Sequence, residues 1–254
     1  MKINELLSLK NKYALVTGGA GHLGQVIVKT LVDLGAHVTS ADLVTLPDLE
    51  REKYLKVDLM NEIEVRSLPM QACSPDGCLD ILINCAAFVG TSNLEGWAVP
   101  FEQQSSDTWR KAFEVNLNSV FNLTQAAVPF LKKSSVASVI NIASIYGICG
   151  PDMSLYEETN MGNPSAYATS KAGLIHFTRW CATTLAPIRF NCITPGGIFR
   201  QQPDSFVKKY CAKVPLNRMA TEDDFSGAIA YLASNMSNYV TGHNLIVDGG
   251  FSIW

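Results

Sequence analysis

The sequence has few of the features that mark metal-binding or disulfide-stabilised proteins. Only four histidines occur among its 254 residues, and none of them is grouped with cysteines at the spacing of a zinc site. The seven cysteines are an odd number and contain no CxxC pair. We therefore expect reduced thiols packed in the core of a cytosolic protein, and no metal site.

Charge is also scarce and nearly balanced. Charged residues make up 17% of the chain, the net charge is −3, and the basic residues are spread along the sequence. This distribution gives no reason to expect binding to nucleic acid or to an anionic membrane. No apolar run reaches the length of a membrane span, and the N-terminal stretch lacks the apolar core of a signal peptide. We expect a cytoplasmic protein.

Short β-branched runs alternate with amphipathic helical patterns along the whole chain. The expected strands are Tyr13–Thr17, His37–Ala41, Tyr54–Val57, Ile81–Asn84, Ser138–Ile142, Arg189–Ile193 and Asn244–Val247. The expected helices are Leu23–Leu34, Trp109–Leu131, Ala166–Leu185 and Glu222–Ala233. Several strands are apolar throughout, which is typical of strands covered on both faces. The alternation predicts an α/β fold: a Rossmann-type, doubly wound parallel sheet of about seven strands with helices on both faces, in one domain over residues 1–254.

A glycine-rich turn joins the first expected strand to the first expected helix. Gly18, Gly21 and Gly24 give the spacing GxxGxxG. Glycine reaches the backbone angles of such a turn at low cost and leaves room for a diphosphate, which the helix N-terminus then attracts. Tight turns also use glycine for steric reasons alone, but the position between strand and helix favours nucleotide binding.

The second expected strand is followed by Asp42, eighteen residues after Gly24. An acid near this distance accepts hydrogen bonds from the adenosine ribose of a dinucleotide. Its carboxylate would repel the 2′-phosphate of NADP, and the next residues, Leu43, Val44 and Thr45, are not basic. The pattern therefore favours NAD. The alternative is a solvated aspartate that caps a turn.

Tyr167 and Lys171 form a YxxxK pair on an expected helix. Residues four apart lie on one face, so the phenol and the ammonium point the same way. The adjacent ammonium stabilises the phenolate and is expected to lower the tyrosine pKa towards that of a general acid/base. A YxxxK pair in isolation more often decorates a helix surface.

The pair is accompanied by several further motifs in a fixed order. They are TGGAGHLG, INCAA, FEVNLNSVF, NIASIYG, YATSK, RFNCITPGGI and TGHNLIVDGG. Together they resemble the short, single-domain branch of the short-chain dehydrogenase/reductase family over nearly the whole chain. The resemblance implies an NAD-dependent oxidoreductase that interconverts a secondary alcohol and a ketone, acting on a small molecule as a homo-oligomer, with a tetramer expected.

The resemblance also implies roles for individual residues. Tyr167 would be the acid/base, Lys171 would lower its pKa and hold the nicotinamide ribose, Ser144 would bind the reacting oxygen, and Asn116 would shape the helix and a proton relay. The implied cofactor-binding residues are Gly18, Gly21, His22, Leu23, Gly24, Asp42, Leu43, Asp58, Leu59, Asn84, Ala86, Tyr167, Lys171, Pro195, Gly196 and Ile198. For a lone Ser144 or Asn116, a purely structural role would be the better interpretation.

The sequence departs from the family pattern in ways that leave rival functions open. His22 replaces the middle glycine, and the resulting spacing is similar to that of sugar-nucleotide epimerases and dehydratases, which retain NAD. The family's threonine after the Pro195–Gly196 turn is absent, and Phe199 and Arg200 stand there instead. A non-catalytic nucleotide sensor is a second rival.

Two segments are expected to cover the substrate. One is the unusually long and polar stretch 147–165, and the other is 198–216. The polar side chains of the first segment predict a polyhydroxylated substrate such as a sugar, and its alternative is a simple wet surface loop.

Overall fold

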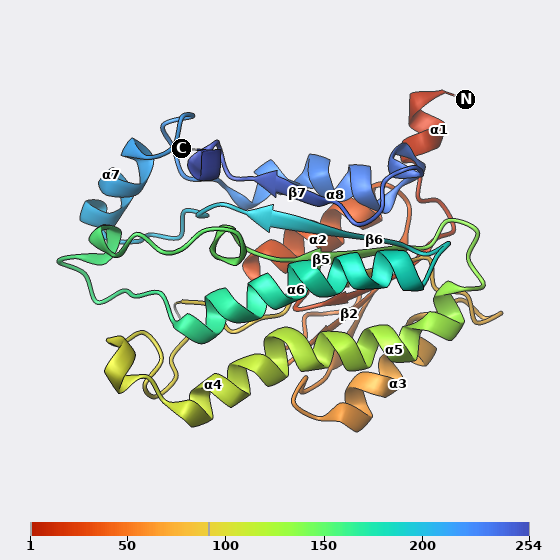
Figure 1. Ribbon diagram of the computed structural model, residues 1–254. Coiled ribbons are helices and arrows are strands. Elements are labelled where there is room, and N and C mark those ends of the chain that lie inside the picture. The colour runs from red at the N-terminus through yellow and green to blue at the C-terminus, as the bar shows by residue number, and fades with distance from the viewer. Residues whose placement is uncertain (1, 91, 254) are drawn as a thin grey trace.

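The computed structural model describes residues 2–90 and 92–253, and all seven of its strands pair in parallel in one sheet (Figure 1). The strands are β1 (Tyr13–Thr17), β2 (His37–Asp42), β3 (Glu52–Lys56), β4 (Ile81–Asn84), β5 (Ser138–Ile142), β6 (Arg189–Pro195) and β7 (Asn244–Val247). Their order across the sheet is β3-β2-β1-β4-β5-β6-β7. This confirms the expected doubly wound α/β fold. The sequence pattern placed the third strand two residues too late.

Helices cover both faces of the sheet (Figure 1). They are α1 (Ile3–Leu7), α2 (His22–Asp33), α3 (Glu62–Ala72), α4 (Ser106–Phe113), α5 (Ser119–Leu131), α6 (Ser165–Thr184), α7 (Asp204–Ala212) and α8 (Ser226–Ala233). The single helix expected over Trp109–Leu131 is divided between α4 and α5 by a π-helical turn, Glu114–Asn118. The expected helix from Glu222 opens with a 3₁₀ turn, Glu222–Phe225 (η5).

The core forms two layers because neighbouring strand residues point to opposite faces. Val16 packs with Ile27 of α2 and Ile229 of α8 on one face. Leu15, its neighbour in β1, packs with Leu68 of α3 and Leu123 of α5 on the other. The residues that point to either face must therefore be apolar, which explains why the sequences of the central strands are continuous apolar runs.

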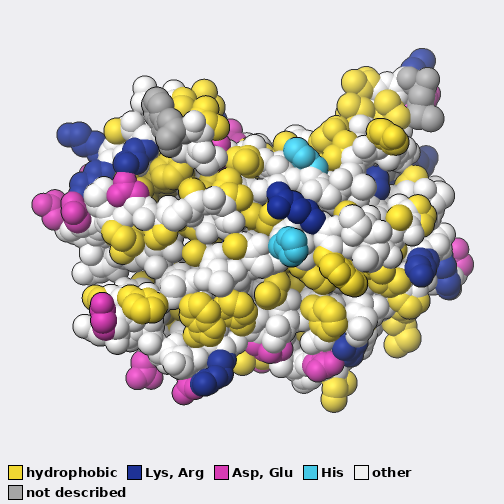
Figure 2. Space-filling model, viewed as in Figure 1, with side chains coloured by type: hydrophobic (Ala, Val, Ile, Leu, Met, Phe, Trp, Pro, Cys, Tyr) yellow, Lys and Arg dark blue, Asp and Glu magenta, His cyan; other side chains and the backbone are white. Residues whose placement is uncertain are grey.

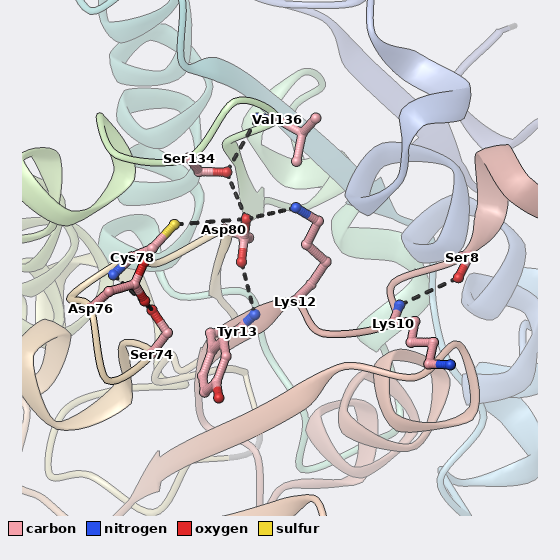
Figure 3. A network of polar contacts seen from close by, with 10 residues as sticks. All are labelled: Ser8, Lys10, Lys12, Tyr13, Ser74, Asp76, Cys78, Asp80, Ser134 and Val136. Atoms are coloured by element: carbon pink, nitrogen blue, oxygen red, sulfur yellow. Dashed lines mark hydrogen bonds and ion pairs between the residues drawn. The ribbon is translucent and has the colours of Figure 1, made fainter.

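The amino ends of the strands are joined by a polar network around Asp80, which is 4% exposed (Figure 3). Its Oδ1 accepts hydrogen bonds from Lys12 Nζ at 3.1 Å and Ser134 Oγ at 2.7 Å, and its Oδ2 accepts from the Tyr13 amide at 3.0 Å. Burial, and then the nearby Asp80 charge, raise the pKa of the Cys78 thiol. The network ties β1 and β4 together at the end away from the glycine-rich turn, and it leaves Cys78 as an unreactive thiol.

The strand order reverses direction between β1 and β4, where the connections lead to opposite edges of the sheet. In parallel sheets, ligands bind outside the carboxyl ends of the strands at such a point. Within residues 2–90 and 92–253, none of the helices combines the length and the apolar character needed to cross a membrane.

Candidate active site

A cavity of about 810 Å³ lies at the carboxyl ends of the strands. It collects segments from all along the chain, and it is lined by every predicted site residue except Asn84 and Asn116. Those that line it are Gly18, Gly21, His22, Leu23, Gly24, Asp42, Leu43, Asp58, Leu59, Ala86, Ser144, Tyr167, Lys171, Pro195, Gly196 and Ile198. Asp42 lies at its outer end, and Ser144 and Tyr167 lie at its inner end.

The glycine-rich turn forms the floor of the cavity between these ends. Gly18 has a φ of +72°, and a Cβ there would lie 2.8 Å from the backbone of Ala86. A Cβ on Gly24 would lie 1.9 Å from the carbonyl oxygen of Gly18, so the first turn of α2 packs directly on the loop. No side chain of the described residues caps α2. Its first N–H groups are therefore free to bind an anion.

Asp42 marks the outer end of the cavity. Its Oδ2 accepts a hydrogen bond from the Ala20 amide of the glycine-rich turn at 3.1 Å, and its Oδ1 accepts one from the Val44 amide at 3.3 Å. The turn-capping alternative is thus present in the structure, but the carboxylate also lines the cavity, beside Leu43 and Asp58. Asp42 can cap the turn and also bind a ribose, because each carboxylate oxygen accepts more than one hydrogen bond.

Ser144 and Tyr167 meet at the inner end. Ser144 follows β5 and begins a 3₁₀ turn, Ile145–Gly147 (η3), which packs against α6. A Cβ on Gly147 would lie 2.9 Å from the backbone of Lys171, so a glycine permits this close approach. Ser144 Oγ accepts from the Tyr146 amide at 3.2 Å and is hydrogen-bonded to the Tyr167 side chain.

The buried tyrosine and lysine titrate differently from the sequence-based expectation. Burial raises the pKa of Tyr167, and the hydrogen bond with Ser144 and the charge of Arg200 only partly oppose that rise. Burial also lowers the pKa of Lys171 to about 8. Lys171 Nζ donates to the carbonyl oxygen of Ile142 at 2.7 Å and lies 5.9 Å from the centre of the Tyr167 ring. Desolvation of the phenol therefore outweighs the groups that lower its pKa.

The cysteines only partly match their expected place in the core. All seven are free thiols; Cys181 and Cys192 are buried, and the other five are half-buried. Cys85 lines the cavity close to Lys171, but burial raises the pKa of its thiol to about 11. A thiol with so high a pKa is a poor nucleophile at neutral pH, which agrees with the packing role expected for Cys85.

Asn116 lies in the π-helical turn, behind the cavity. Its Oδ1 accepts from the Phe88 amide at 2.8 Å, and its Nδ2 donates to the Phe88 carbonyl and to Ser170 Oγ, each at 3.1 Å. Phe88 lines the cavity, and Ser170 precedes Lys171 on α6. Asn116 is thus placed to hold the loop after β4 against α6 and does not itself reach the cavity.

Asn84 is directed away from the cavity, contrary to its expected contact with the cofactor. Its Nδ2 donates to Asn141 Oδ1 at 2.7 Å, and Asn141 in turn donates to Thr178 on α6 at 2.8 Å. Strand alternation explains the error, because Asn84 shares a face with Leu82, which packs towards α5. The following residues, Cys85 and Ala86, are the ones that line the cavity.

The two expected covering segments form a roof over the inner end. Leu155 and Tyr156, from the 3₁₀ turn Met153–Tyr156 (η4), pack with Phe206 and Tyr210 of α7 in one apolar cluster. The long stretch 147–165 is therefore partly buried and is not simply a wet loop. Figure 1 shows this stretch beside α7.

Several polar side chains of that stretch do not face the cavity, contrary to the argument for a sugar made from them. Asp152 forms an ion pair with Lys213, and Glu157 forms one with Lys209 at 3.3 Å. Lys209 also donates to the carbonyl oxygen of Ser154 at 2.9 Å. These contacts attach the stretch to α7, because its acids pair with Lys209 on that helix and with Lys213 directly after it.

The cavity is also lined by polar residues outside the predicted catalytic and cofactor-binding set, and two of them, Tyr156 and Asn163, belong to the polar stretch 147–165. Tyr146 and Tyr156 lie with their hydroxyls 2.6 Å apart, and Asn163 interacts with both. Arg200 and Gln202 line the cavity after β6. The absence of the family's threonine after the Pro195–Gly196 turn, where Phe199 and Arg200 stand, was a visible signal for this segment. Nothing in the local pattern indicates the tyrosine pair, which depends on how η4 folds back.

The chain is similar to known proteins over nearly its whole length. The family model described as enoyl-(acyl carrier protein) reductase matches residues 19–252. Nodulation protein G of Rhizobium sp. (strain N33) is 32% identical over 261 residues, which cover 98% of this chain and 100% of that protein. The 3-oxoacyl-[acyl-carrier-protein] reductase FabG of Chlamydia muridarum is 30% identical over 261 residues, which cover 96% and 98%.

A solved structure shares the fold closely. It is a short-chain dehydrogenase from Leptospira borgpetersenii with bound NAD⁺, which is 34% identical with a TM-score of 0.88 and covers 99% of this chain and 96% of that one. Sequence relatives, fold and cavity agree with the resemblance read from the motifs. The chain belongs to the short-chain dehydrogenase/reductase family of oxidoreductases.

Proposed function

We propose that this protein uses NAD to interconvert a secondary alcohol and a ketone. The observation that carries the proposal is a single cavity with Asp42 at one end, Ser144 and Tyr167 at the other, and the glycine-rich turn between them. The close approach at Gly18 and the uncapped start of α2 fit a dinucleotide diphosphate. When bound, the nicotinamide would supply or accept the hydride.

Tyr167 would transfer the proton. Its raised pKa keeps the phenol protonated at neutral pH, so it can donate to the oxygen of a carbonyl substrate. Ser144, hydrogen-bonded to the same phenol, would hold that oxygen. In the reverse direction the substrate hydroxyl would return its proton to the phenolate, and the two residues would keep the oxygen in place for both directions.

Lys171 would act through position as much as through charge. One of its N–H groups is held by the Ile142 carbonyl oxygen, which leaves two to donate to ribose hydroxyls. Such contacts would favour the charged form of a lysine whose pKa burial has lowered to about 8. The ammonium would then stabilise the Tyr167 phenolate more than it does in the protein alone.

The preference for NAD rests on the charges along the cavity. Asp42 and Asp58 line the outer end, whereas the Lys and Arg residues of the lining are Lys171, which is bound to Ile142, and Arg200, which is paired with Glu222. A 2′-phosphate beside Asp42 would meet like charge, and Lys56, the cross-strand neighbour of Asp42, does not line the cavity. The relative from Leptospira borgpetersenii, solved with NAD⁺, supports the same preference.

The test is calorimetric titration of the protein with NAD and NADP. The unmodified protein should bind NAD more tightly, and the double variant Asp42→Ala, Leu43→Arg should shift the preference towards NADP. Lys132→Arg, at the exposed end of α5, is a control that leaves Asp42 and the cavity lining unchanged. Tighter binding of NADP by the unmodified protein would contradict the proposal.

We further propose a hydroxylated, sugar-like substrate, supported by the tyrosine pair. Two adjacent hydroxyls share one hydrogen bond, so one of their two protons is left to donate to a ligand. Asn163 Oδ1 is buried and has no hydrogen-bond partner among the described residues. One donor and one acceptor beside the reacting centre suit a second hydroxyl on the substrate. Oxidation of polyols, sugars and sugar nucleotides, followed by NADH absorbance, tests this choice.

A further inference from the structure

Arg200 occupies a position between the glycine-rich turn and the catalytic end of the cavity. Its loop is fixed by backbone hydrogen bonds, from Phe199 N to the Ala220 oxygen at 2.8 Å and from Ala220 N to the Gly197 oxygen at 2.9 Å. Its side chain lines the cavity, and its Nε donates to Glu222 Oε1 at 3.0 Å. The ion pair therefore orients the guanidinium towards Glu222.

The position of Glu222 shows that the Arg200 side chain extends towards α2. Glu222 is the first residue of η5, which packs against α2, and it lines a small hollow together with His22 and Gln25 of the first turn of α2. On the other side, the charge of Arg200 reaches both Tyr167 and Cys85. Arg200 thus lies between the start of α2 and the acid/base.

A dinucleotide bound as proposed above would pass between the start of α2 and Tyr167, where Arg200 lies. With its adenosine ribose at Asp42 and its nicotinamide ribose at Lys171, its two phosphates pass the start of α2. Lys171 has one N–H group bound to Ile142 and a pKa lowered to about 8, so Arg200 is the permanently charged cation of the described lining. The ion pair with Glu222 engages only Nε, which leaves both terminal NH₂ groups for phosphate oxygens.

We propose that Arg200 clamps the diphosphate of the bound dinucleotide and that Glu222 is a positioning residue that aims it. The inference rests on the proposed function, because it assumes the dinucleotide orientation given there. Arg200, which follows β6, would bind the phosphates on one side, and the first N–H groups of α2 would bind them on the other.

The test compares the affinities of three probes measured by calorimetry. NAD and ADP-ribose both carry the diphosphate, and adenosine carries no phosphate. Arg200→Gln should weaken binding of NAD and ADP-ribose by about 10- to 100-fold, the range for a lost hydrogen bond between charged groups, and leave adenosine unchanged. Raising the salt concentration should weaken NAD binding more in the unmodified protein than in the variant.

Arg218→Gln is the matched control, because Arg218 forms an ion pair with Asp224 of the same 3₁₀ turn but does not line the cavity. It should leave all three affinities unchanged. Glu222→Gln keeps the arginine but removes the ion pair that orients it, so it should weaken NAD binding several-fold. This variant tests the proposal if Arg200→Gln does not fold. Unchanged NAD affinity in Arg200→Gln, or an equal loss for adenosine, overturns the clamp.

The same titrations separate this inference from the proposed function. If the unmodified protein does not bind NAD, the proposed function fails. If it binds NAD and Arg200→Gln binds NAD equally well, only the clamp fails. A variant that keeps its NAD affinity but shows a raised KM for an anionic substrate would assign Arg200 to the substrate and would also overturn the clamp.

Discussion

At the scale of single residues, Tyr167 and Lys171 show how far spacing alone can predict a site. Their separation placed both on one face of α6, and both line the cavity. Spacing did not show that Lys171 Nζ is bound to Ile142, or that burial raises the pKa of Tyr167. Both properties depend on β5 and on the roof, which are distant in sequence.

The raised pKa of Tyr167 predicts the direction of the pH dependence. Alcohol oxidation needs the phenolate, so its kcat/KM should rise with pH up to the pKa of Tyr167, whereas carbonyl reduction should not rise. Tyr167→Phe should remove this dependence and lower kcat by ~10²–10⁴-fold, with the Kd for NAD nearly unchanged. Tyr239→Phe is the control, because Tyr239 is fully exposed. Turnover near that of the unmodified enzyme by Tyr167→Phe would exclude the assignment.

At the scale of elements, the strongly periodic segments were predicted well and the short ones were not. The helices α2 and α6 begin within one residue of their expected starts. The helix α3 was not predicted, because it is more polar than α6 and has Pro69 in its interior. The helix α7 was expected only as a covering segment. It is held by Phe206 and Tyr210, one helical turn apart, whose partners come from the long stretch before α6.

Within the stretch 147–165, Tyr156 is the residue that we expect to affect substrate specificity most. Tyr156 is 8% exposed, packs on Phe206 and carries the hydroxyl next to Tyr146. Tyr156→Phe keeps the packing and removes one hydrogen-bonding group, worth ~0.5–1.5 kcal/mol, so KM for a hydroxylated substrate should rise about 2- to 10-fold. The Kd for NAD should not change.

The measurement is steady-state kinetics with a substrate that the NADH screen identifies, and Tyr239→Phe is again the matched control. Analogues of the substrate that lack the second hydroxyl should show equal KM values with the variant and with the unmodified enzyme. A variant whose KM is unchanged for every substrate would remove the tyrosine pair from the specificity argument.

At the scale of the whole molecule, the sequence predicted the set of strands better than their arrangement. The alternation of strands and helices indicated a parallel sheet, and the glycine-rich turn indicated its binding end. The order β3-β2-β1-β4-β5-β6-β7 came only with the structure. That order brings the segments around Asp42, Ser144 and Arg200 to one cavity, because every strand ends at the same edge of the sheet.

The outer faces of the long helices lead to the assembly that we propose. Figure 2 shows apolar side chains gathered over α4, α5 and α6. Trp109, Phe121 and Trp180 are 37%, 46% and 56% exposed, and Phe121 lies 6.2 Å from the ring of Phe177 on the neighbouring helix. Helices that are apolar on a second face need a second partner, and we propose that a second copy of this chain covers these helices.

Light scattering at micromolar concentration should therefore give the mass of an oligomer, with a tetramer expected. The double variant Phe121→Glu, Trp180→Glu should lower that mass, because two carboxylates would be buried without partners at the interface. Ile63→Glu, on α3, is the control: Ile63 is 83% exposed and lies outside the proposed interface, so its variant should keep the full mass. A monomeric mass for the unmodified protein would contradict the proposal. An oligomer that the double variant leaves intact would place the interface elsewhere on the molecule.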